Sequence, residues 1–590
     1  MSVRDEVAAA FRDGVDGLAD RRVSTKRLVL GTVVAGVAVL TLVPLVFLLW
    51  TSVWSGYPGE IGGAFTLDHF VAVYREGFFD VPTLLANTLV VAVGMTVTGV
   101  ALGLTLAWLF VRTNLPTKGG LELVLLSGQA IPGYVFGIMY ITAYGPQNGL
   151  VSVAVAEALG LGSISLGLFT PWGVAFVAGV NVVSTAYLLT VPALQDMDAS
   201  FEEVSRIHGA SVPQTLRSVT LPLVKPALLS AVITVFLYGM GEFAIVSVLG
   251  SRHGFDVYST VIGSAINSRF PPAYGEAAAL SCSLLLATGV LVYYYRQVTS
   301  RKREFMTLTG QSGRRRTWDL GRWRWPLAGG LWGVVALVWI LPILAMALTS
   351  LHSTWTGHVR LSGLSLEHYV TAVTSSGLRE AFANSVLVAV GAATLGTVLV
   401  VGAAYYTERT DGRFRGAVDF LTLTPLAVPG IITGAGLIFL SLWLGKLPGV
   451  TLYGTLAIIA LGSVIVFLPV SSRIAVGNVV QIHSVLEEAA RVAGASWLRQ
   501  LREVFLPLFR NTAVVLWFFL AVHVFQLLSI PWMTYSSDTV VIPVELFQLY
   551  MYEPALSLVA AISTVFIGLT VLFVLAMRVC GITFYELGQH

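Results

Sequence analysis

The chain has 590 residues, of which 56% are hydrophobic and 11% charged, and its mean hydropathy is +0.80. This composition excludes a soluble globular protein and predicts a polytopic membrane protein. The net charge of +3 is too small to indicate a nucleic acid partner. The two cysteines, Cys282 and Cys580, lie in or beside apolar segments, so neither a disulfide framework nor a thiolate metal site is predicted.

Residues 1–27 form a charged, amphipathic N-terminal segment. Basic residues at 21–27 precede an apolar run that is too long for the hydrophobic region of a cleavable signal peptide. We therefore expect this segment to lie in the cytoplasm as a helix along the membrane surface.

Long apolar windows follow along the rest of the chain. A bilayer core of about 30 Å needs about 20 apolar residues in a helix, and about twelve such windows can be distinguished. The sequence thus predicts an all-α membrane protein with about twelve transmembrane helices. The first six windows are 28–52, 83–111, 120–143, 168–191, 226–250 and 276–296; the second six are 326–350, 382–407, 417–443, 452–475, 511–532 and 555–578.

Basic residues in the connections set the expected orientation, because lysine and arginine concentrate on the cytoplasmic side of membrane proteins. They gather in alternate connections: the N-terminal segment, 112–118, 296–324 and 409–415. The intervening loops hold few of them. We expect a multi-pass protein of the plasma membrane with both termini in the cytoplasm.

Two charged segments interrupt the apolar pattern at residues 201–223 and 486–508, and we call them the first and second polar loops. Both lie in cytoplasmic connections, and an offset of 285 residues relates them. Each is predicted to form a short helix, a break at Gly209 or Gly494, and a second helix that opens with Leu-Pro. The identical pairs are Glu202/Glu487, Glu203/Glu488, Arg206/Arg491, Gly209/Gly494, Ala210/Ala495, Ser211/Ser496, Leu216/Leu501, Arg217/Arg502, Leu221/Leu506 and Pro222/Pro507.

The repeat extends beyond the polar loops at an offset of 297 residues, at which Arg112 matches Arg409 and Pro132-Gly133 matches Pro429-Gly430. The change of offset places extra residues of the first half at about 144–175. The sequence predicts two fused six-helix domains, 28–298 and 326–590, related by a pseudo-two-fold axis along the membrane normal. A basic cytoplasmic linker, 299–325, joins them.

The polar loops resemble the EAA loop of binding-protein-dependent ABC importer permeases. The second loop has the full Glu488-Ala-Ala-x3-Gly494 pattern, whereas the first has Val204 and Ser205 in place of the two alanines. In that family, which has the type I ABC importer fold, the loop is the cytoplasmic coupling helix that sits in a cleft of the ATP-hydrolysing subunit. The resemblance implies that the coupling residues are Glu202, Glu203, Arg206, Gly209, Ala210, Ser211, Glu487, Glu488, Arg491, Gly494, Ala495 and Ser496.

The sequence contains no Gly-x4-Gly-Lys-Ser/Thr phosphate-binding motif, which predicts a transport subunit without an ATPase site of its own. The resemblance implies two copies of a separate ATPase subunit and an extracytoplasmic solute-binding protein as partners, beside the lipid bilayer. The histidines have no ligand spacing, and no catalytic triad or carboxylate pair stands out. We expect no cofactor, metal site or nucleic acid partner.

Two further features lie inside the apolar windows. Pro132-Gly133 and Pro429-Gly430 should kink the third helix of each half, because proline removes a backbone hydrogen bond, and the kinks indicate either a bending gate or static packing. Glu242 lies deep in an apolar run, where an acid is costly unless it faces a cavity or a partner. It is a candidate for the translocation path or for a satisfied contact between helices.

The substrate is less defined by the sequence. The fused arrangement and the segment Phe270-Pro-Pro-Ala-Tyr-Gly-Glu-Ala-Ala-Ala-Leu-Ser281 resemble the ferric-iron type of permease, with thiamine and polyamine permeases as alternatives. The rival classes are an ion-coupled carrier and a structural membrane subunit. A proton-driven carrier should have several paired acidic and basic residues at mid-membrane, whereas Glu242 is a single acid. A structural subunit would not need two matched cytoplasmic loops.

Overall fold

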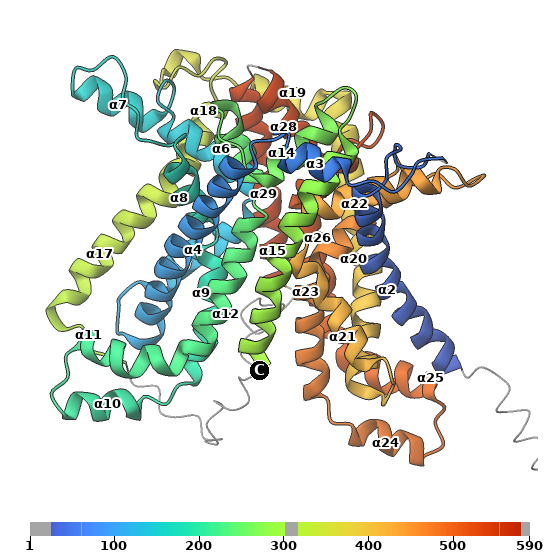
Figure 1. Cartoon of the computed structure of the whole chain (residues 1–590). Helices are drawn as coiled ribbons and strands as arrows, with labels where there is room; N and C mark the ends of the chain where they lie inside the picture. The colour runs from blue at the N-terminus through green and yellow to red at the C-terminus, as the bar shows by residue number, and fades with distance from the viewer. Residues whose placement is uncertain (1–24, 61, 301–316, 554, 580–590) are drawn as a thin grey trace, which may run out of the picture. The chain divides into compact units, whose positions relative to one another are not determined.

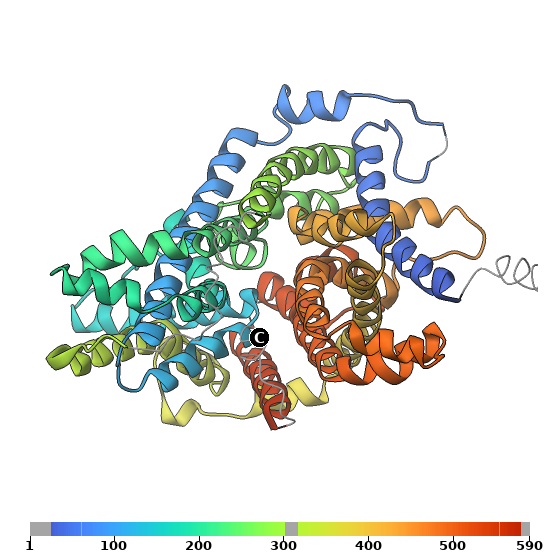
Figure 2. The same cartoon turned by 90° about the horizontal axis from the view of Figure 1, so that it is seen from below.

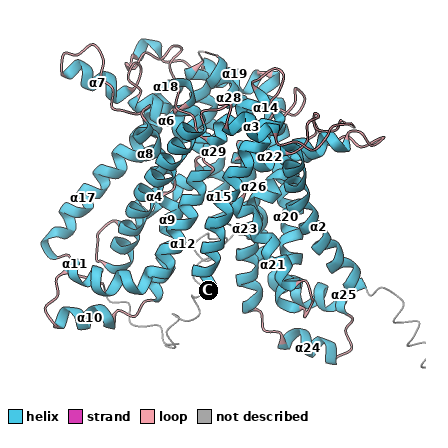
Figure 3. Ribbon diagram, in the orientation of Figure 1, coloured by secondary structure: helices cyan, strands magenta, loops and turns pink. Residues whose placement is uncertain are grey.

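A computed structural model of the chain describes residues 25–60, 62–300, 317–553 and 555–579. These residues form helices joined by loops and turns (Figure 3), and three isolated bridges are the only β-type pairings among them. Most of the predicted N-terminal segment, Cys580 and the part of the predicted linker at 301–316 lie outside the described residues.

The helices follow the predicted windows closely, and Figure 1 labels most of them. In the first half they are α2 (Thr25–Ser52), α3 (Asp68–Tyr74), α4 (Val81–Arg112), α5 (Lys118–Ser127), α6 (Gly133–Tyr144), α7 (Leu150–Ala158), α8 (Pro171–Asn181), α9 (Val183–Asp196), α10 (Ser200–Ile207), α11 (Val212–Thr215), α12 (Leu221–Met240), α13 (Ala244–Leu249), α14 (Tyr258–Asn267) and α15 (Tyr274–Ser300). In the second half they are α17 (Arg324–Val335), α18 (Leu341–Ser350), α19 (Glu367–Thr374), α20 (Ser376–Arg409), α21 (Arg415–Leu423), α22 (Gly430–Leu444), α23 (Leu456–Gln481), α24 (Val485–Val492), α25 (Trp497–Gln500), α26 (Leu506–Gln526), α27 (Ser529–Thr534), α28 (Ile542–Tyr552) and α29 (Leu556–Val579).

Among the described residues, eight helices are long and apolar enough to cross a membrane, and the number rises to 11 if three bent helix pairs are counted as spans. The twelfth predicted window coincides with α29, a helix of 24 residues whose segment Leu556–Leu572 is apolar. The prediction of an all-α, multi-pass membrane protein is confirmed, and the number of spans is close to the twelve expected.

The prediction of a kink at Pro132-Gly133 was too mild, because the helix ends there. α5 runs into a 3-10 turn at Gly128–Ala130, Pro132 precedes the first residue of α6, and the two helical segments meet at 114°. A 3-10 turn at Thr424–Ala427 likewise precedes Pro429 and α22. A proline at a helix start loses no hydrogen bond, since the first turn has no intrahelical acceptor for that position.

The predicted windows 226–250 and 511–532 also run across breaks. α12 ends at Met240 and α13 begins at Ala244, while α26 ends at Gln526 and α27 begins at Ser529. Hydropathy does not detect these breaks, because the residues on both sides are apolar. Broken helices at membrane depth are typical of substrate pathways in transporters.

The chain divides into two compact units. Among the described residues, the smaller consists of 25–43, 393–425 and 467–520, and the larger of 44–60, 62–300, 317–392, 426–466, 521–553 and 555–579. The first polar loop belongs to the larger unit and the second to the smaller. The predicted domain boundaries at 298/299 and 325/326 stay a prediction, because these units follow packing rather than the sequence repeat.

In the larger unit, α4 packs along α8, α9 and α12 (Figures 1 and 2). Glycines on α4 allow this close approach. A Cβ at Gly99 would lie 2.7 Å from Val182 Cγ2, and one at Gly103 would lie 2.8 Å from Ala186 Cβ. Small residues at such contacts let membrane helices gain van der Waals packing where lipid supplies no hydrophobic driving force.

The smaller unit has its own buried core. Side chains from α2, α20, α23 and α26 meet in it, including Val37, Val400, Ala475 and Phe509. Gly402 lets α20 approach Val33 of α2 closely, since a Cβ there would lie 2.8 Å from Val33 Cγ2. This core supports the C-terminal ends of α20 and α23, between which the second polar loop is held.

His69 and Glu276 make a pH-sensitive contact in the larger unit. His69 Nδ1 lies 3.2 Å from Glu276 Oε1, and His69 Nε2 lies 2.9 Å from the Trp54 carbonyl oxygen. The hydrogen bond to Glu276 raises the pKa of His69 above its usual value of 6.5, against an opposing effect of burial. The contact therefore stabilises the fold fully below about pH 6.5 and less as the pH rises through the folded-state pKa.

Between about pH 6 and pH 8.5, the free energy of unfolding of the wild-type chain should fall by up to about 1 kcal/mol more than that of the His69→Gln variant. Glutamine keeps hydrogen-bonding capacity but has no charge in this pH range. Thermal unfolding in detergent at both pH values measures the difference. Parallel curves for the two proteins would contradict this prediction.

Candidate functional site

The two polar loops have the same backbone construction. In the first, α10 is followed by Gly209, α11, a π-helical turn at Leu216–Thr220 and α12. In the second, α24 is followed by Gly494, α25, a π-helical turn at Leu501–Phe505 and α26. Gly209 has φ +82° and Gly494 has φ +83°, a left-handed conformation that favours glycine, so both short helices end in the same way.

Glu202 of the first loop is buried, with 3% of the residue exposed. The Thr220 hydroxyl donates to its Oε1 at 2.6 Å, and Trp318 Nε1 donates to its Oε2 at 3.2 Å. Arg112 Nε, at the end of α4, lies 3.9 Å from the same Oε2. Arg112 Nη2 also donates to the Met197 carbonyl oxygen at 2.6 Å, so this arginine joins α4 to both sides of the loop.

Glu487 of the second loop is also buried, at 7% exposed, and also lies beside an arginine, although its hydrogen-bond partner differs. Arg409 Nε, at the end of α20, lies 3.5 Å from Glu487 Oε1, and the Tyr405 hydroxyl donates to Oε2 at 3.0 Å. Arg409 Nη2 donates to the carbonyl oxygens of Val479, at 2.9 Å, and Ile482. Ile482 is the repeat counterpart of Met197, so both arginines bind the loop at equivalent points.

Most of the other residues predicted for coupling lie on or near the surface. Glu488, Arg491, Gly494 and Ser496 are exposed, as are Arg206, Gly209 and Ser211, whereas Glu203, Ala210 and Ala495 are partly buried. Glu202 and Glu487 face inward, and their side chains hold the loops to the helices behind them. The predicted set therefore combines surface residues with two buried structural acids.

Each loop also presents apolar side chains at helical spacing. Phe201 is 47%, Val204 53% and Ile207 82% exposed on α10. The counterparts on the second loop are Leu486, 47% exposed, Ala489 and Val492, 90% exposed. Positions three residues apart share one face of a helix, so both loops have an apolar face that no described residue covers.

Arg112 and Arg409 had no predicted role, although the sequence repeat pairs them. The signal in the sequence was that Glu202 recurs as Glu487 at the offset of 285 residues and Arg112 recurs as Arg409 at the offset of 297. Trp318 gave no such signal, because it lies in the predicted linker. The Arg206 guanidinium stacks on the Trp318 ring, with Cζ 4.6 Å from the ring centroid. The backbone of Trp318 forms an isolated β-bridge with that of Thr113.

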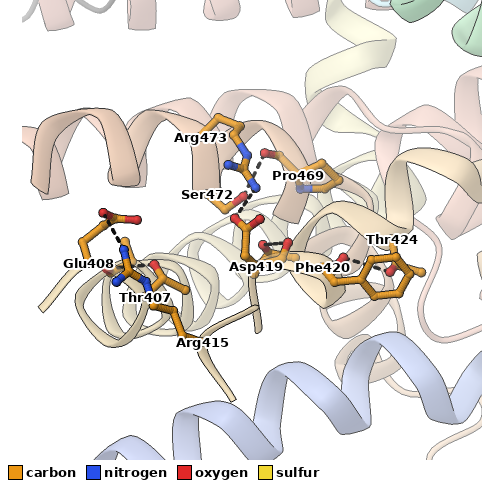
Figure 4. Close-up of polar contacts among 11 residues, drawn as sticks. Thr407, Glu408, Arg415, Asp419, Phe420, Thr424, Pro469, Ser472 and Arg473 are labelled. Atoms are coloured by element: carbon orange, nitrogen blue, oxygen red, sulfur yellow. Dashed lines mark hydrogen bonds and ion pairs between the residues drawn. The ribbon is translucent and has the colours of Figure 1, made fainter. Parts of the chain in front are cut away.

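A second pair of contacts joins the helix before each Pro-Gly break to the helix that leads into each polar loop. In the smaller unit, Asp419 of α21 accepts from Arg473 Nη2 of α23 at 2.5 Å, and Arg415 pairs with Glu408 at 3.6 Å (Figure 4). In the larger unit, Glu122 of α5 accepts from the Tyr187 hydroxyl of α9 at 2.5 Å. Glu122 and Asp419 are repeat counterparts at the 297 offset, so an acid makes the link in both halves.

Glu242 lies at the break between α12 and α13 and lines a cavity of about 230 Å³ in the larger unit. Gly133 lines the same cavity, and a Cβ there would lie 3.5 Å from Ala244 Cβ. Pro429 and Gly430 do not line it, but Pro429 packs against Gly241 and Gly430 against Ser529, both of which do. The Pro-Gly breaks and the interrupted helices thus meet around Glu242. Within the described residues, no group of three or more His, Cys, Asp or Glu side chains could hold a metal ion.

Comparisons with known proteins agree with this arrangement. Residues 99–304 match the family model of the binding-protein-dependent transport system inner membrane component. The chain is 26% identical to the "Probable ABC transporter permease protein y4fN" of Sinorhizobium fredii, over 82% of this chain and 84% of that protein.

Two other relatives are named for iron. The chain is 26% identical to the ferric transport system permease protein FbpB of Actinobacillus pleuropneumoniae, over 57% of this chain and 48% of that protein. It is 23% identical to the Fe(3+)-transport system permease protein FbpB 2 of Haemophilus influenzae, over 72% and 75%. Shorter matches include permeases named for sulfate and for spermidine and putrescine.

The family match includes the first polar loop, and the repeat carries its construction to the second. The helices, the paired loops and these matches agree on one assignment. Residues 99–304 are similar to the binding-protein-dependent transport system inner membrane components, and the relative that matches most of the chain is named as a probable ABC transporter permease.

Proposed function

We propose that this chain forms the transmembrane pathway of an ATP-driven importer and carries both coupling loops of the complex. The observation that carries the proposal is the duplicated loop construction, in which a buried glutamate, an arginine from a preceding helix and an uncovered apolar face recur in both halves. Each loop would seat in one copy of a separate ATPase subunit. An extracytoplasmic binding protein would deliver the solute from the other side.

Ferric iron is the proposed substrate. The support is the ferric-transport naming of relatives that cover up to 72% of this chain, together with the segment 270–281. A polyamine is the alternative, because a relative is named for spermidine and putrescine. Thiamine stays a third possibility from the sequence resemblance.

The contacts around the loops suggest how ATP hydrolysis would drive the pathway. Movement of an ATPase subunit would displace α10 or α24, and the buried ion pair Arg112–Glu202 or Arg409–Glu487 would pass the displacement to α4 or α20. The links Glu122–Tyr187 and Asp419–Arg473 would pass it to the helices that precede the Pro-Gly breaks. Transport requires these partners, since a conformational equilibrium shifts only when a ligand binds one state better than the other.

The proposed orientation places the polar loops in the cytoplasm and residues 68 and 367 outside. Single cysteines introduced as Glu203→Cys, Glu488→Cys, Asp68→Cys and Glu367→Cys test this in a background with Cys282 and Cys580 replaced. We expect an impermeant maleimide to label positions 68 and 367 in intact cells and all four positions after permeabilisation. Labelling at position 203 or 488 in intact cells would reverse the orientation.

The proposed function is tested in proteoliposomes that contain the chain with or without its ATPase subunit and binding protein. We expect accumulation of ferric iron only when both partners and ATP are present, and no ATP hydrolysis by the purified chain alone. Hydrolysis by the chain alone, or partner-independent accumulation driven by a proton gradient, would overturn the proposal.

A further inference from the structure

The cavity beside Glu242 has an uneven distribution of polar groups between the two halves of the repeat. The first half contributes Tyr134, Asn181 and Glu242 to the lining. Their repeat counterparts are the apolar residues Ile431, Val466 and Leu527. The second half contributes Gln526 and Ser529, whose counterparts are Gly241 and Ala244. The halves have therefore diverged at the positions that line this cavity.

Several of these polar groups have unused hydrogen-bonding capacity. Tyr134 is 1% exposed, and its hydroxyl has no hydrogen-bond partner in the described structure. The Asn181 side chain likewise makes no hydrogen bond to any described residue, whereas Gln526 Nε2 donates to the Ala130 carbonyl oxygen at 3.2 Å. A buried hydroxyl without a partner destabilises the protein, so a polar occupant that bonds this hydroxyl would be stabilised in the cavity.

Glu242 is the charged residue in the cavity lining, so the lining can carry negative charge only. Glu242 Oε1 accepts a hydrogen bond from the Ile245 amide at 2.8 Å, and no lysine, arginine or histidine is among the described residues that line the cavity. A carboxylate at membrane depth without a basic partner attracts cations and repels anions. The other polar groups offer neutral oxygen atoms, which also suit a cation.

A single carboxylate is too few for tight metal binding, which agrees with the absence of a three-residue ligand cluster in the described part of the chain. Weak binding is what a passage site requires, because the solute has to leave as readily as it enters.

We propose that this cavity is a weak passage site that selects cationic solutes over oxyanions, with Glu242 as its charge-selecting residue. The inference rests on the proposed importer function and adds the place on the pathway, and the residue, at which a cation would be favoured over an oxyanion. It separates cations such as ferric iron or spermidine from sulfate, although relatives are named for all three.

The test compares uptake of radiolabelled ferric iron, spermidine and sulfate by the complete importer in membrane vesicles. Glu242→Gln removes the charge but keeps an oxygen that accepts from the Ile245 amide, so it separates charge from structure. We expect wild type to import a cation, and Glu242→Gln to lower that uptake about tenfold, the usual effect of losing one charge-assisted contact.

A charge swap provides the second arm. Glu242→Leu combined with Leu527→Glu moves the carboxylate to the repeat-equivalent position, which also lines the cavity. We expect the double variant to regain most of the cation uptake that Glu242→Leu alone loses. Recovery is not expected if Glu242 acts only by binding the Ile245 amide, so failure of the double variant would overturn the inference, as would full cation uptake by Glu242→Gln.

The outcomes distinguish this inference from the proposed function. ATP-dependent import of sulfate but of neither cation would overturn the cation assignment and leave the importer function intact. Absence of uptake of all three solutes, together with no stimulation of ATP hydrolysis by the binding protein, would count against the importer function, and the inference would fail with it.

Discussion

Arg409→Met is expected to remove nearly all ATP-driven transport by releasing the second polar loop from α20. The substitution leaves Glu487 buried without its cationic partner, which costs about 3–5 kcal/mol. It also removes the donor to the carbonyl oxygens of Val479 and Ile482, where α23 leads into the loop. Uptake in proteoliposomes and the protease sensitivity of residues 482–500 measure the effect.

Two control variants separate the buried charge from general damage. Arg409→Met combined with Glu487→Gln removes both charges and keeps an acceptor for the Tyr405 hydroxyl, so most of the lost stability should return. Arg499→Ala removes a surface ion pair with Glu503, in which the Arg499 side chain is 66% exposed and the Glu503 side chain 56% exposed. The free energy of unfolding should fall by less than about 1 kcal/mol. If Arg409→Met transported as well as Arg499→Ala, the arginine would not hold the loop.

The polar loops were predictable because their signal is local and occurs twice. Gly209 and Gly494 end the short helices through left-handed φ values, and a proline thirteen residues after each glycine, with a leucine just before it, marks the start of the next long helix. The Pro-Gly breaks were located correctly for the same reason. Their sharpness was underestimated, because sequence does not distinguish a proline inside a helix from one that precedes it.

The functional contacts of the loops depend on residues far apart in the chain. Glu202 meets Arg112, Thr220 and Trp318, and hydropathy patterns contain no information about such meetings. The helix breaks after Met240 and Gln526 were not predicted, because Phe243 lies in the first break and Leu527 and Leu528 form the second, so hydropathy stays high there. Glu242 was singled out by its cost in an apolar run, but its neighbours Tyr134 and Asn181 were not, since a tyrosine or an asparagine in a membrane helix is not unusual.

Replacing the apolar tips of α10 and α24, Ile207→Asp with Val492→Asp, is expected to separate the permease from the proposed ATPase subunit. These side chains are 82% and 90% exposed, so the fold should lose less than about 0.5 kcal/mol in the isolated chain. In the complex, an unpaired carboxylate would be buried in each ATPase cleft at a cost of about 3 kcal/mol, which corresponds to about a hundredfold weaker binding per site.

Co-purification of the ATPase subunit and its stimulated hydrolysis measure this loss, and the thermal unfolding of the permease alone measures the fold. Ile207→Leu with Val492→Leu is the matched control, because it keeps an apolar side chain of similar volume at each tip. The two single aspartate variants should each retain one working loop and show intermediate association. Normal ATPase binding by the double aspartate variant would mean that these apolar faces are not the docking surfaces.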